Sequence, residues 1–522
     1  MAARLLGIDS GGTMTKVALF DEEGNELACD HRPNRIMFPA AGCTERDPDA
    51  MWHSTAEAIA SVLERSGTAP SEIAAVTPSG FGAGLYMVDG AGRSVRPAFG
   101  STDSRSVPVI EEWQRTGVTR EIEPRISQQV WSGQSLAILG WLQRHEPETL
   151  AATRHLLLCK DFLRLRLCGD ISTDPTDAGC AGFADIEAGA YAEDAFVAAG
   201  LEGCIPKLPP IAPSTAVAGR VSAEAARATG LLEGTPVGRG VYDVVGCTLA
   251  SGVSASDQLG VVAGTFSINS TLHRTPCLDP NPTLQVPYPL NDLYLATIAT
   301  PTSASNLEWF CKTLLGAEAE RARGKGRSIY EVCSDLVSRS LDRPRDMLFF
   351  PYVFGGPQGA PAGLLGATAR SGLADVMRAV FEGIVFAHRA DIDYLLGGPD
   401  SAPVASVRLS GGPSKSPVWS QIFCDALGLP LSIANGSEFG AKGAAMCGAV
   451  ATGLHPDMQT ASRKMIRVAR EHTPDPARHE DLDRAYRHYR RVGARMAEVW
   501  ADPTPVAEAP ARAESHLAGA SA

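Results

Sequence analysis

The chain opens with the run Leu5-Leu6-Gly7-Ile8-Asp9-Ser10-Gly11-Gly12-Thr13-Met14-Thr15-Lys16-Val17-Ala18-Leu19-Phe20-Asp21. Two apolar segments flank the Gly11-Gly12 pair, and glycine permits the positive φ angles that tight turns require. The pattern predicts a β-hairpin whose first strand ends at Asp9 and whose second strand returns from Lys16 to Phe20.

The polar residues of this hairpin suit a phosphate group and a metal ion. Glycines let backbone N–H groups approach a ligand closely, while Thr13 and Thr15 add hydroxyls and Lys16 adds a cation. Asp9 supplies a hard oxygen ligand of the kind that Mg²⁺ prefers. The hairpin is interpreted as a phosphate-binding turn beside a Mg²⁺-binding carboxylate. The simpler alternative is a solvated turn.

A second copy of the pattern lies about half the chain further on. Residues 259–272 repeat the strand, a Gly264-Thr265 turn and a second strand. Repetition at this scale indicates two similar domains rather than a solenoid. The two hairpins are therefore expected to close on one polyphosphate from opposite sides.

Composition sets the broad class of the protein. A chain of 522 residues is too long for one ordinary core, and 44% hydrophobic with 20% charged residues is typical of a globular protein. The net charge of −12 argues against a general nucleic-acid binder. No apolar run reaches the ~18 residues of a membrane span, and no secretory leader is recognisable. The 12 cysteines form no C-x-x-C pair, so the prediction is a cytoplasmic protein with reduced thiols.

Several other stretches carry candidate functional residues. A glycine-rich loop over 78–84 follows a predicted buried strand, where open α/β sheets place ligands. Asp103 and Arg105 either hold a polyhydroxylated ligand or form a structural ion pair. Asp243 begins an apolar helix, a position where an aspartate is usually only an N-cap. Residues 407–416 form a strand that ends in paired glycines, against which a base or sugar can lie.

Other phosphate-binding and hydrolytic motifs are missing from the sequence. It contains no G-x-x-x-x-G-K-[ST], no G-x-G-x-x-G after the first strand, no H-E-x-x-H and no G-x-S-x-G. Phosphate binding therefore rests on the two hairpins.

Four motifs in order and at the right spacing resemble the FGGY carbohydrate kinases, which share a fold superfamily with actin, the heat-shock chaperone ATPases and hexokinase. They are Gly7–Thr13, Gly240–Gly246, Ala263–Ser267 and Leu409–Asp425. The resemblance covers residues 4 to about 500. Residues 84–105 and 301–310 look most like the L-xylulose kinase branch.

The resemblance implies an α/β fold with two RNase-H-like (actin/hexokinase-type) domains flanking a deep cleft. Residues 1–253 would form a sugar-binding N-terminal domain, and residues 254–501 a nucleotide-binding C-terminal domain. Residues 502–522 are rich in proline, alanine and glutamate, a composition typical of a disordered tail.

The resemblance also implies roles for individual residues. Asp243 matches the general base that contacts the sugar hydroxyl, and Asp9 matches the carboxylate that organises Mg²⁺. The residues matched to ATP, through the phosphate hairpins or the nucleotide loop, are Gly12, Thr13, Lys16, Gly264, Thr265, Ala304, Glu308, Gly411, Gly412 and Ser416. The sugar-binding candidates are Phe81, Asp103, Arg105 and Trp131, together with Gln128 and Gln129.

The expected function is that of an ATP- and Mg²⁺-dependent kinase of a small sugar, such as the ketopentose L-xylulose. Phe81-Gly82-Ala83 stands where relatives carry bulky polar residues, which leaves erythritol, D-xylulose, ribulose and glycerol as alternative acceptors. An actin-like or chaperone-like ATPase and a sugar sensor are the alternatives from other classes. The resemblance favours a homodimer, with neither nucleic acid nor membrane as a partner.

Overall fold

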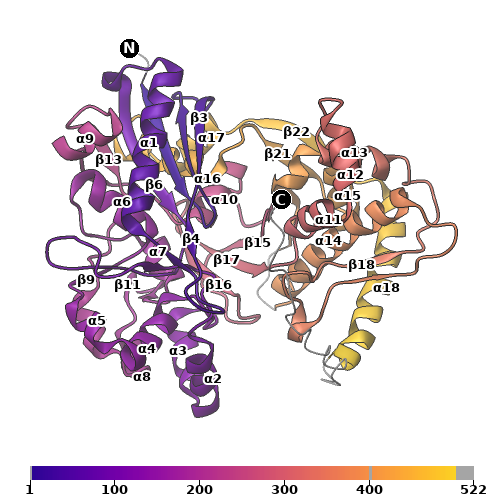
Figure 1. Cartoon of the computed structure of the whole chain (residues 1–522), viewed down its shortest axis with the longest axis horizontal. Helices are drawn as coiled ribbons and strands as arrows, with labels where there is room; N and C mark the ends of the chain where they lie inside the picture. The colour runs from indigo at the N-terminus through magenta and orange to yellow at the C-terminus, as the bar shows by residue number, and fades with distance from the viewer. Residues whose placement is uncertain (1–2, 399–402, 501–522) are drawn as a thin grey trace, which may run out of the picture.

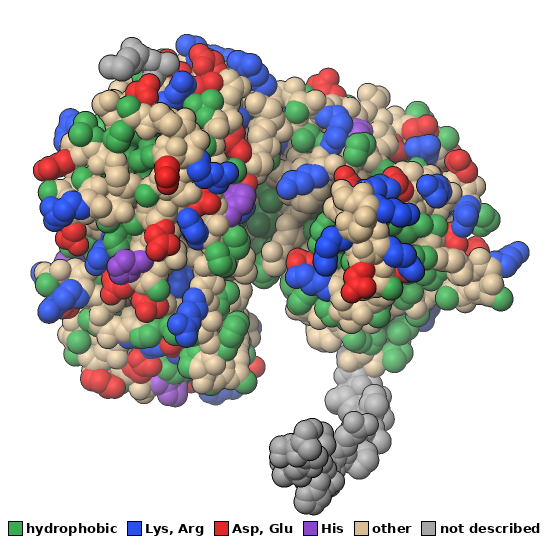
Figure 2. Space-filling model, turned by 45° about the horizontal axis from the view of Figure 1, so that its top comes forward, with side chains coloured by type: hydrophobic (Ala, Val, Ile, Leu, Met, Phe, Trp, Pro, Cys, Tyr) green, Lys and Arg blue, Asp and Glu red, His purple; other side chains and the backbone are tan. Residues whose placement is uncertain are grey.

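A computed structural model describes residues 3–398 and 403–500 of the chain (Figure 1). They form two α/β lobes, each built around its own sheet, and Figure 2 shows the molecular surface hollowed between them. The expected tail over 502–522 lies outside the described residues.

The N-terminal lobe contains the sheet β12-β13-β6-β1-β2-β3. β1 and β2 are antiparallel and pair Asp9 with Lys16, so the opening run forms the predicted hairpin. β6 and β13 continue the sheet in parallel with β1. The bounds of these strands are β1 Arg4–Ser10, β2 Met14–Phe20, β3 Glu26–Pro33, β6 Ile73–Gly80, β12 Val217–Arg220 and β13 Pro236–Gly238.

The C-terminal lobe repeats this arrangement in the sheet β16-β17-β15-β14-β20-β21-β22. β14 and β15 are antiparallel, and β14 runs parallel to β20 as β1 does to β6. The predicted second hairpin is thus confirmed. The strands are β14 Gln258–Ala263, β15 Ser267–His273, β16 Leu284–Tyr288, β17 Leu293–Thr300, β20 Ser406–Gly411, β21 Leu431–Ala434 and β22 Val468–His472.

Short strands and helices surround the two sheets. The short strands are β4 Ile36–Met37, β5 Glu45–Arg46, β7 Tyr86–Val88, β8 Ala98–Phe99, β9 His155–Leu157, β10 Ala184–Asp185, β11 Ala190–Tyr191, β18 Leu348–Phe350 and β19 Gly363–Leu365. The helices of the first half are α1 Pro48–Ser66, α2 Val107–Thr116, α3 Val118–Ile126, α4 Ser135–His145, α5 Pro147–Ala152, α6 Cys159–Cys168, α7 Pro175–Cys180, α8 Glu193–Ala198, α9 Ala223–Thr229 and α10 Asp243–Ser251. Those of the second half are α11 Ser305–Leu314, α12 Gly316–Arg323, α13 Ile329–Ser338, α14 Leu373–Leu395, α15 Pro417–Leu427, α16 Phe439–Ala451, α17 Met458–Met465 and α18 Pro476–Trp500. Within residues 3–398 and 403–500, no helix is long and apolar enough to cross a membrane.

Two helices at the centre of Figure 1, α10 and α16, join the lobes. They pack against each other, and α16 also packs on β1 and β6 although it belongs to the second half of the chain. Small residues permit this approach: a β-carbon built at Gly443 would overlap the carbonyl oxygen of Gly246, and one at Gly7 would overlap that of Ala441. The strands of the two sheets therefore lie on either side of a boundary between residues 253 and 254 in the sequence. Helix α16 follows this boundary in the sequence but packs on the sheet of the N-terminal lobe.

Filling the contact between α10 and α16 is expected to destabilise the protein. A Gly443→Ala side chain would press against the Gly246 backbone, which cannot rotate away as a side chain can. We expect a loss of ~3 kcal/mol of unfolding free energy, measured by urea denaturation followed by circular dichroism. Gly316→Ala is the matched control, because a β-carbon there meets nothing within 4 Å. Equal stability of the two variants would contradict this packing.

Candidate active site

Carboxylates from distant parts of the chain, those of Asp9, Asp243 and Glu438, lie near one another where α10 and α16 begin. Asp9, at the end of β1, is 8% exposed, and its Oδ1 atom has no hydrogen-bond partner among the described residues. A β-carbon built at Gly440, near the start of α16, would overlap Asp9 Oδ2. Burial raises the pKa of Asp9, the nearby Lys16 ammonium lowers it, and the Glu438 carboxylate raises it. An unpaired buried carboxylate oxygen of this kind suits a cation.

Asp243 is the first residue of α10 and is half-buried. Tyr242 occupies the N-cap position, so Asp243 does not serve as the N-cap that its sequence position suggests. Burial raises the pKa of Asp243 well above that of an ordinary aspartate. The negative charges of Asp9 and Asp177 raise it further, whereas a hydrogen bond from the Val244 backbone lowers it. A carboxyl with a raised pKa accepts a proton readily.

Lys16 and His31 reach across to the start of α16. Lys16 Nζ lies 3.3 Å from Glu438 Oε2, and His31 Nε2 lies 3.1 Å from Glu438 Oε1. Burial lowers the pKa of Lys16, but the carboxylates of Asp9 and Glu438 raise it above its usual value. Lys16 therefore remains a cation beside the first hairpin. Sequence reasoning missed Glu438, because its partner lies more than 400 residues earlier in the chain.

Two side chains outside any motif hold the tip of the first hairpin. Arg46 is buried and donates from Nη2 to the carbonyl oxygens of Gly11, at 2.8 Å, and of Gly12. Asn34 Nδ2 donates to the Gly11 carbonyl oxygen at 2.9 Å. Gly12 and Thr13 themselves are exposed. Hydrogen bonds from Arg46 and Asn34 to its carbonyl oxygens thus hold the turn that is expected to bind phosphate.

The nucleotide candidates gather around the second hairpin. Gly411 has a φ of 89°, and a β-carbon there would overlap the backbone of Ala263, which precedes Gly264. A β-carbon at Gly412 would lie 3.6 Å from the β-carbon of Ala304, the N-cap residue of α11. Ser305 Oγ, in the first turn of α11, donates to the Thr265 carbonyl oxygen at 2.8 Å. The hairpin, the paired glycines and α11 therefore share one site.

Glu308 and Ser416 lie on helices that border this site. Glu308 is exposed in the first turn of α11 and pairs with Lys312 at 2.6 Å. Ser416 is the N-cap of α15, where its Oγ accepts a hydrogen bond from the Trp419 N–H at 3.3 Å. The same oxygen lies 2.9 Å from Ser334 Oγ of α13.

The loop expected to bind the sugar is packed tightly. Phe81 is 6% exposed, and the Arg46 guanidinium lies 4.8 Å above the centre of its ring. A β-carbon at Gly82 would overlap the ring of Tyr242 and the Cys180 sulfur, so only glycine fits there. The structure thus places most of the Phe81 ring in the core of the N-terminal lobe.

Asp103 and Arg105 form the structural ion pair that was one of their two interpretations. Asp103 is fully buried, accepts a hydrogen bond from the Thr44 N–H at 2.7 Å and pairs with Arg105 at 2.8 Å. Arg105 also pairs with Glu45 at 2.8 Å, and its guanidinium packs on the ring of Phe99. The ion pair therefore links the loop around residue 103 to Thr44 and Glu45. Direct contact of Asp103 or Arg105 with a sugar stays a prediction.

The loop over 127–131 docks on the C-terminal lobe. Gln129 Nε2 donates to the Asn281 carbonyl oxygen at 2.7 Å, and Gln285 Nε2 of β16 donates to the Ser127 carbonyl oxygen at 2.8 Å. Gln128 Nε2 donates to the Gly179 carbonyl oxygen at 2.5 Å. The two glutamines therefore bind backbone. The buried Trp131 Nε1 has no hydrogen-bond partner within the described chain.

A buried charge cluster beneath the site was missed in the sequence. Lys160 Nζ, fully buried, lies 2.8, 2.9 and 3.0 Å from carboxylate oxygens of Asp161, Asp174 and Asp177. Burial raises the pKa of Asp177 to about 7, although Lys160 opposes the shift. Through its charge Asp177 contributes to the raised pKa of Asp243. None of the motifs found in the sequence includes these four residues.

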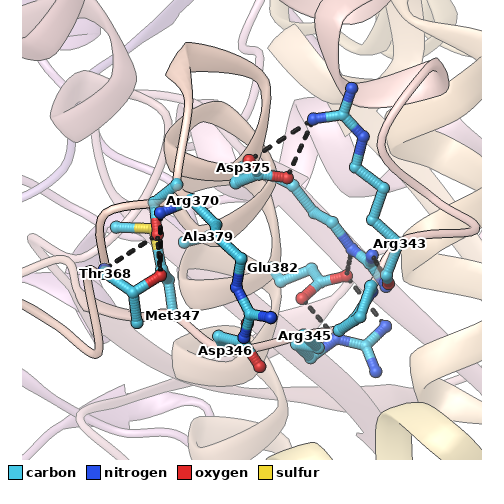
Figure 3. A pocket seen from close by; sticks show the side chains of 12 residues that line it. Arg343, Arg345, Asp346, Met347, Thr368, Arg370, Asp375, Ala379 and Glu382 are labelled. Atoms are coloured by element: carbon cyan, nitrogen blue, oxygen red, sulfur yellow. Dashed lines mark hydrogen bonds and ion pairs between the residues drawn. The ribbon is translucent and has the colours of Figure 1, made fainter.

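A separate cavity of about 380 Å³ lies in the C-terminal lobe beside the start of α14 (Figure 3). Two of its arginines, Arg345 and Arg378, are paired with Glu382 at 2.7 and 2.8 Å. Arg343 lies 3.4 Å from Asp375. Because carboxylates largely balance these arginines and none of the candidate residues lines the cavity, it is not the candidate active site.

Comparisons with known proteins agree with this geometry. Two family models, described as the N-terminal and C-terminal domains of the FGGY family of carbohydrate kinases, match residues 4–250 and 259–452. A probable L-xylulose kinase of Pasteurella multocida is 31% identical over 93% of this chain and 98% of its own length. An L-xylulose/3-keto-L-gulonate kinase of Escherichia coli is 28% identical over 94% of this chain and 97% of its own.

A solved structure supports the fold. The crystal structure of a xylulose kinase from Rhodospirillum rubrum superposes with a TM-score of 0.82 at 24% identity, covering 95% of this chain and 99% of that one. The expected two-domain α/β architecture of the actin/hexokinase type is thereby confirmed. With both family models matched across most of its length, the chain belongs to the FGGY family of carbohydrate kinases.

Proposed function

We propose that this ATP-dependent carbohydrate kinase transfers the γ-phosphate to a terminal hydroxyl of a ketopentose such as L-xylulose, with Asp243 as the general base. The observation that carries the proposal is the position of Asp243. Its half-buried carboxylate, with a raised pKa, lies at the start of α10 within the electrostatic influence of Asp9.

Asp243 would remove the proton from the sugar hydroxyl as its oxygen attacks the γ-phosphorus. A sugar hydroxyl is a poor nucleophile, so a base within hydrogen-bond reach is needed. Phosphoryl transfer otherwise requires positioning and charge neutralisation. The hairpins at Gly12-Thr13 and Gly264-Thr265, together with the Lys16 cation, would meet the phosphates from the two lobes. Ala304, Gly411, Gly412 and Ser416 would hold the remainder of the nucleotide.

The residues present fit a Mg²⁺ ion. Asp9 offers a buried carboxylate oxygen without a hydrogen-bond partner. In the ranges that the structure describes, no group of three or more acidic, histidine or cysteine side chains could hold a metal. A metal with few protein ligands and several phosphate or water ligands is the usual arrangement for Mg²⁺ in kinases. When bound, Mg²⁺ would neutralise phosphate charge.

The choice of a ketopentose rests on the similar proteins from P. multocida and E. coli, whose names specify L-xylulose. The tightly packed Phe81-Gly82 loop keeps erythritol, D-xylulose, ribulose and glycerol as alternatives. We also propose a homodimer in the cytoplasm. The scattered cysteines, which form no C-x-x-C pair, support that compartment.

A coupled assay of ADP release tests the substrate. Purified protein with Mg·ATP is offered L-xylulose, D-xylulose, ribulose, erythritol and glycerol at equal concentrations. The proposal predicts that L-xylulose gives the largest kcat/KM. A preference for erythritol or glycerol would overturn the ketopentose assignment and leave the kinase activity intact. ADP release that no acceptor stimulates would contradict the kinase activity itself.

The Trp131 indole N–H is expected to bind a sugar hydroxyl, because it is buried without a partner. Trp131→Phe keeps an aromatic ring and removes only this donor. We expect the KM for the sugar to rise about tenfold, since a polar substrate group is then left unpaired. The KM for ATP should stay unchanged. Trp141→Phe, in the same lobe, is the control, and an unchanged sugar KM in Trp131→Phe would remove this residue from the site.

A further inference from the structure

A buried polar network lies directly behind the second hairpin. Its centre is His388, a fully buried residue of α14 that no role described above uses. His388 Nδ1 lies 2.9 Å from Asn269 Oδ1 and 3.0 Å from Ser267 Oγ, both on β15. His388 Nε2 lies 2.9 Å from Ser303 Oγ, just before α11. One imidazole thus joins the strand that leaves the hairpin to the start of α11.

The hydrogen-bond partners of His388 determine which of its ring nitrogens carries the proton. Burial lowers the pKa of His388 to about 3, so the ring is neutral and carries a single N–H. Asn269 Nδ2 donates to Ser267 Oγ at 2.9 Å, which leaves Asn269 Oδ1 as an acceptor. The proton of His388 must therefore be on Nδ1, where it can be donated to that oxygen. Nε2 is then an acceptor, and the Ser303 hydroxyl donates to it.

The network ends on a carboxylate. Ser267 Oγ donates to Asp391 Oδ2 at 3.0 Å, and Thr300 Oγ1 donates to the same oxygen at 2.9 Å. Hydrogen bonds therefore run in one direction from Ser303 through His388 and Asn269 to Asp391. A chain of this kind is fully satisfied in only one arrangement, which makes it a rigid connection.

The two elements that this chain connects carry the nucleotide candidates. Ser267 begins β15 two residues after Thr265, and Ser303 directly precedes Ala304. Ser305 Oγ already binds the Thr265 carbonyl oxygen from the same end of α11. A change in the spacing between β15 and α11 would therefore move the hairpin relative to the nucleotide loop.

We propose that His388, as its Nδ1–H tautomer between Asn269 and Ser303, is a positioning residue that fixes the Gly264-Thr265 hairpin against α11 in the geometry that binds ATP. This inference rests on the proposed role of that hairpin. It predicts a defect confined to the nucleotide, because the network touches only the C-terminal lobe.

Calorimetric titration with Mg·ADP tests the inference without requiring turnover. His388→Ala is expected to raise the ADP dissociation constant about tenfold, since it breaks the connection on both sides. Ser303→Ala removes only the donor to Nε2 and should raise it about threefold. His388→Asn can keep a donor near the Nδ1 position and should recover part of the affinity that His388→Ala loses.

Ile384→Ala is the matched control, because Ile384 is fully buried on α14 one turn before His388 and packs in the core of the C-terminal lobe. It should lower the melting temperature while leaving the ADP dissociation constant within twofold of wild type. A merely structural His388 would behave in the same way, so wild-type ADP affinity in His388→Ala or in Ser303→Ala would overturn the inference. A parallel rise in the KM for the sugar would also overturn it. If wild-type protein binds ADP but phosphorylates no acceptor, the proposed function fails while the His388 result stands.

Discussion

Asp243→Asn is expected to lower kcat about 1,000-fold with the fold intact, because asparagine has nearly the same shape but cannot accept the sugar proton. The KM for ATP should change little, since Asp243, at the start of α10, is proposed to contact the sugar hydroxyl and not the nucleotide. Stopped-flow and steady-state ADP release with saturating sugar measure the loss. Asp375→Asn is the matched control, because Asp375 also lies in the first turn of a helix, where it accepts the Gly372 N–H at 2.9 Å. That variant should lose stability and keep its rate.

The pH profile gives an independent test of the same residue. A base must be ionised to act, so the rate should fall as the pH drops through the pKa of Asp243. Burial and the charges of Asp9 and Asp177 raise that pKa, and the acidic limb should therefore lie above the range of an ordinary aspartate. The limb should be missing from the residual activity of Asp243→Asn. If the acidic limb of the pH profile is unchanged in Asp243→Asn, the ionisation that controls the rate belongs to another group.

Asp9→Asn is expected to lower kcat about 100-fold and to raise the Mg²⁺ concentration that gives half-maximal activity. Asp9 is buried at the end of β1, and its Oδ1 has no hydrogen-bond partner in the described chain, so this oxygen is open to a metal. Titration of activity with Mg²⁺ at fixed ATP measures both effects. Asp21→Asn serves as the control, because Asp21 follows β2 at the other end of the hairpin and binds the Asn25 N–H at 2.8 Å. A wild-type Mg²⁺ requirement in Asp9→Asn would exclude a role with the metal.

The features that sequence revealed best are those set by short-range pattern. Two apolar runs joined by a short turn form a hairpin by pairing with each other, so neighbouring residues alone predict it. This holds for the hairpin at Gly11-Gly12 and for the one at Gly264-Thr265. Long-range pairing left no such local signal. Glu438 and Lys16 are separated by most of the chain, and Arg46 lies in a two-residue strand.

Polar residues near the site show why residue type alone did not decide a role. Asp103, Arg105, Gln128 and Gln129 are the kinds of side chain that bind sugar hydroxyls. In the structure each of them satisfies a buried charge or a backbone group, and sugar binding by them stays a prediction. Whether such a side chain binds a sugar or a neighbouring protein group depends on its contacts in the folded protein, which the sequence alone does not reveal. His388 was missed for the same reason, because its hydrogen-bond partners come from two other segments of the chain, β15 and the residue before α11.

The most direct test of the proposed reaction is the fate of the phosphate. Wild-type protein with Mg·ATP and L-xylulose is followed by ³¹P nuclear magnetic resonance until ATP is consumed. The proposed mechanism predicts one phosphomonoester of the sugar for each ADP formed, with the phosphate on a terminal carbon, and about 1,000-fold slower formation of this product with Asp243→Asn. ADP that accumulates together with free inorganic phosphate would contradict it, because water rather than a sugar hydroxyl would then be the acceptor.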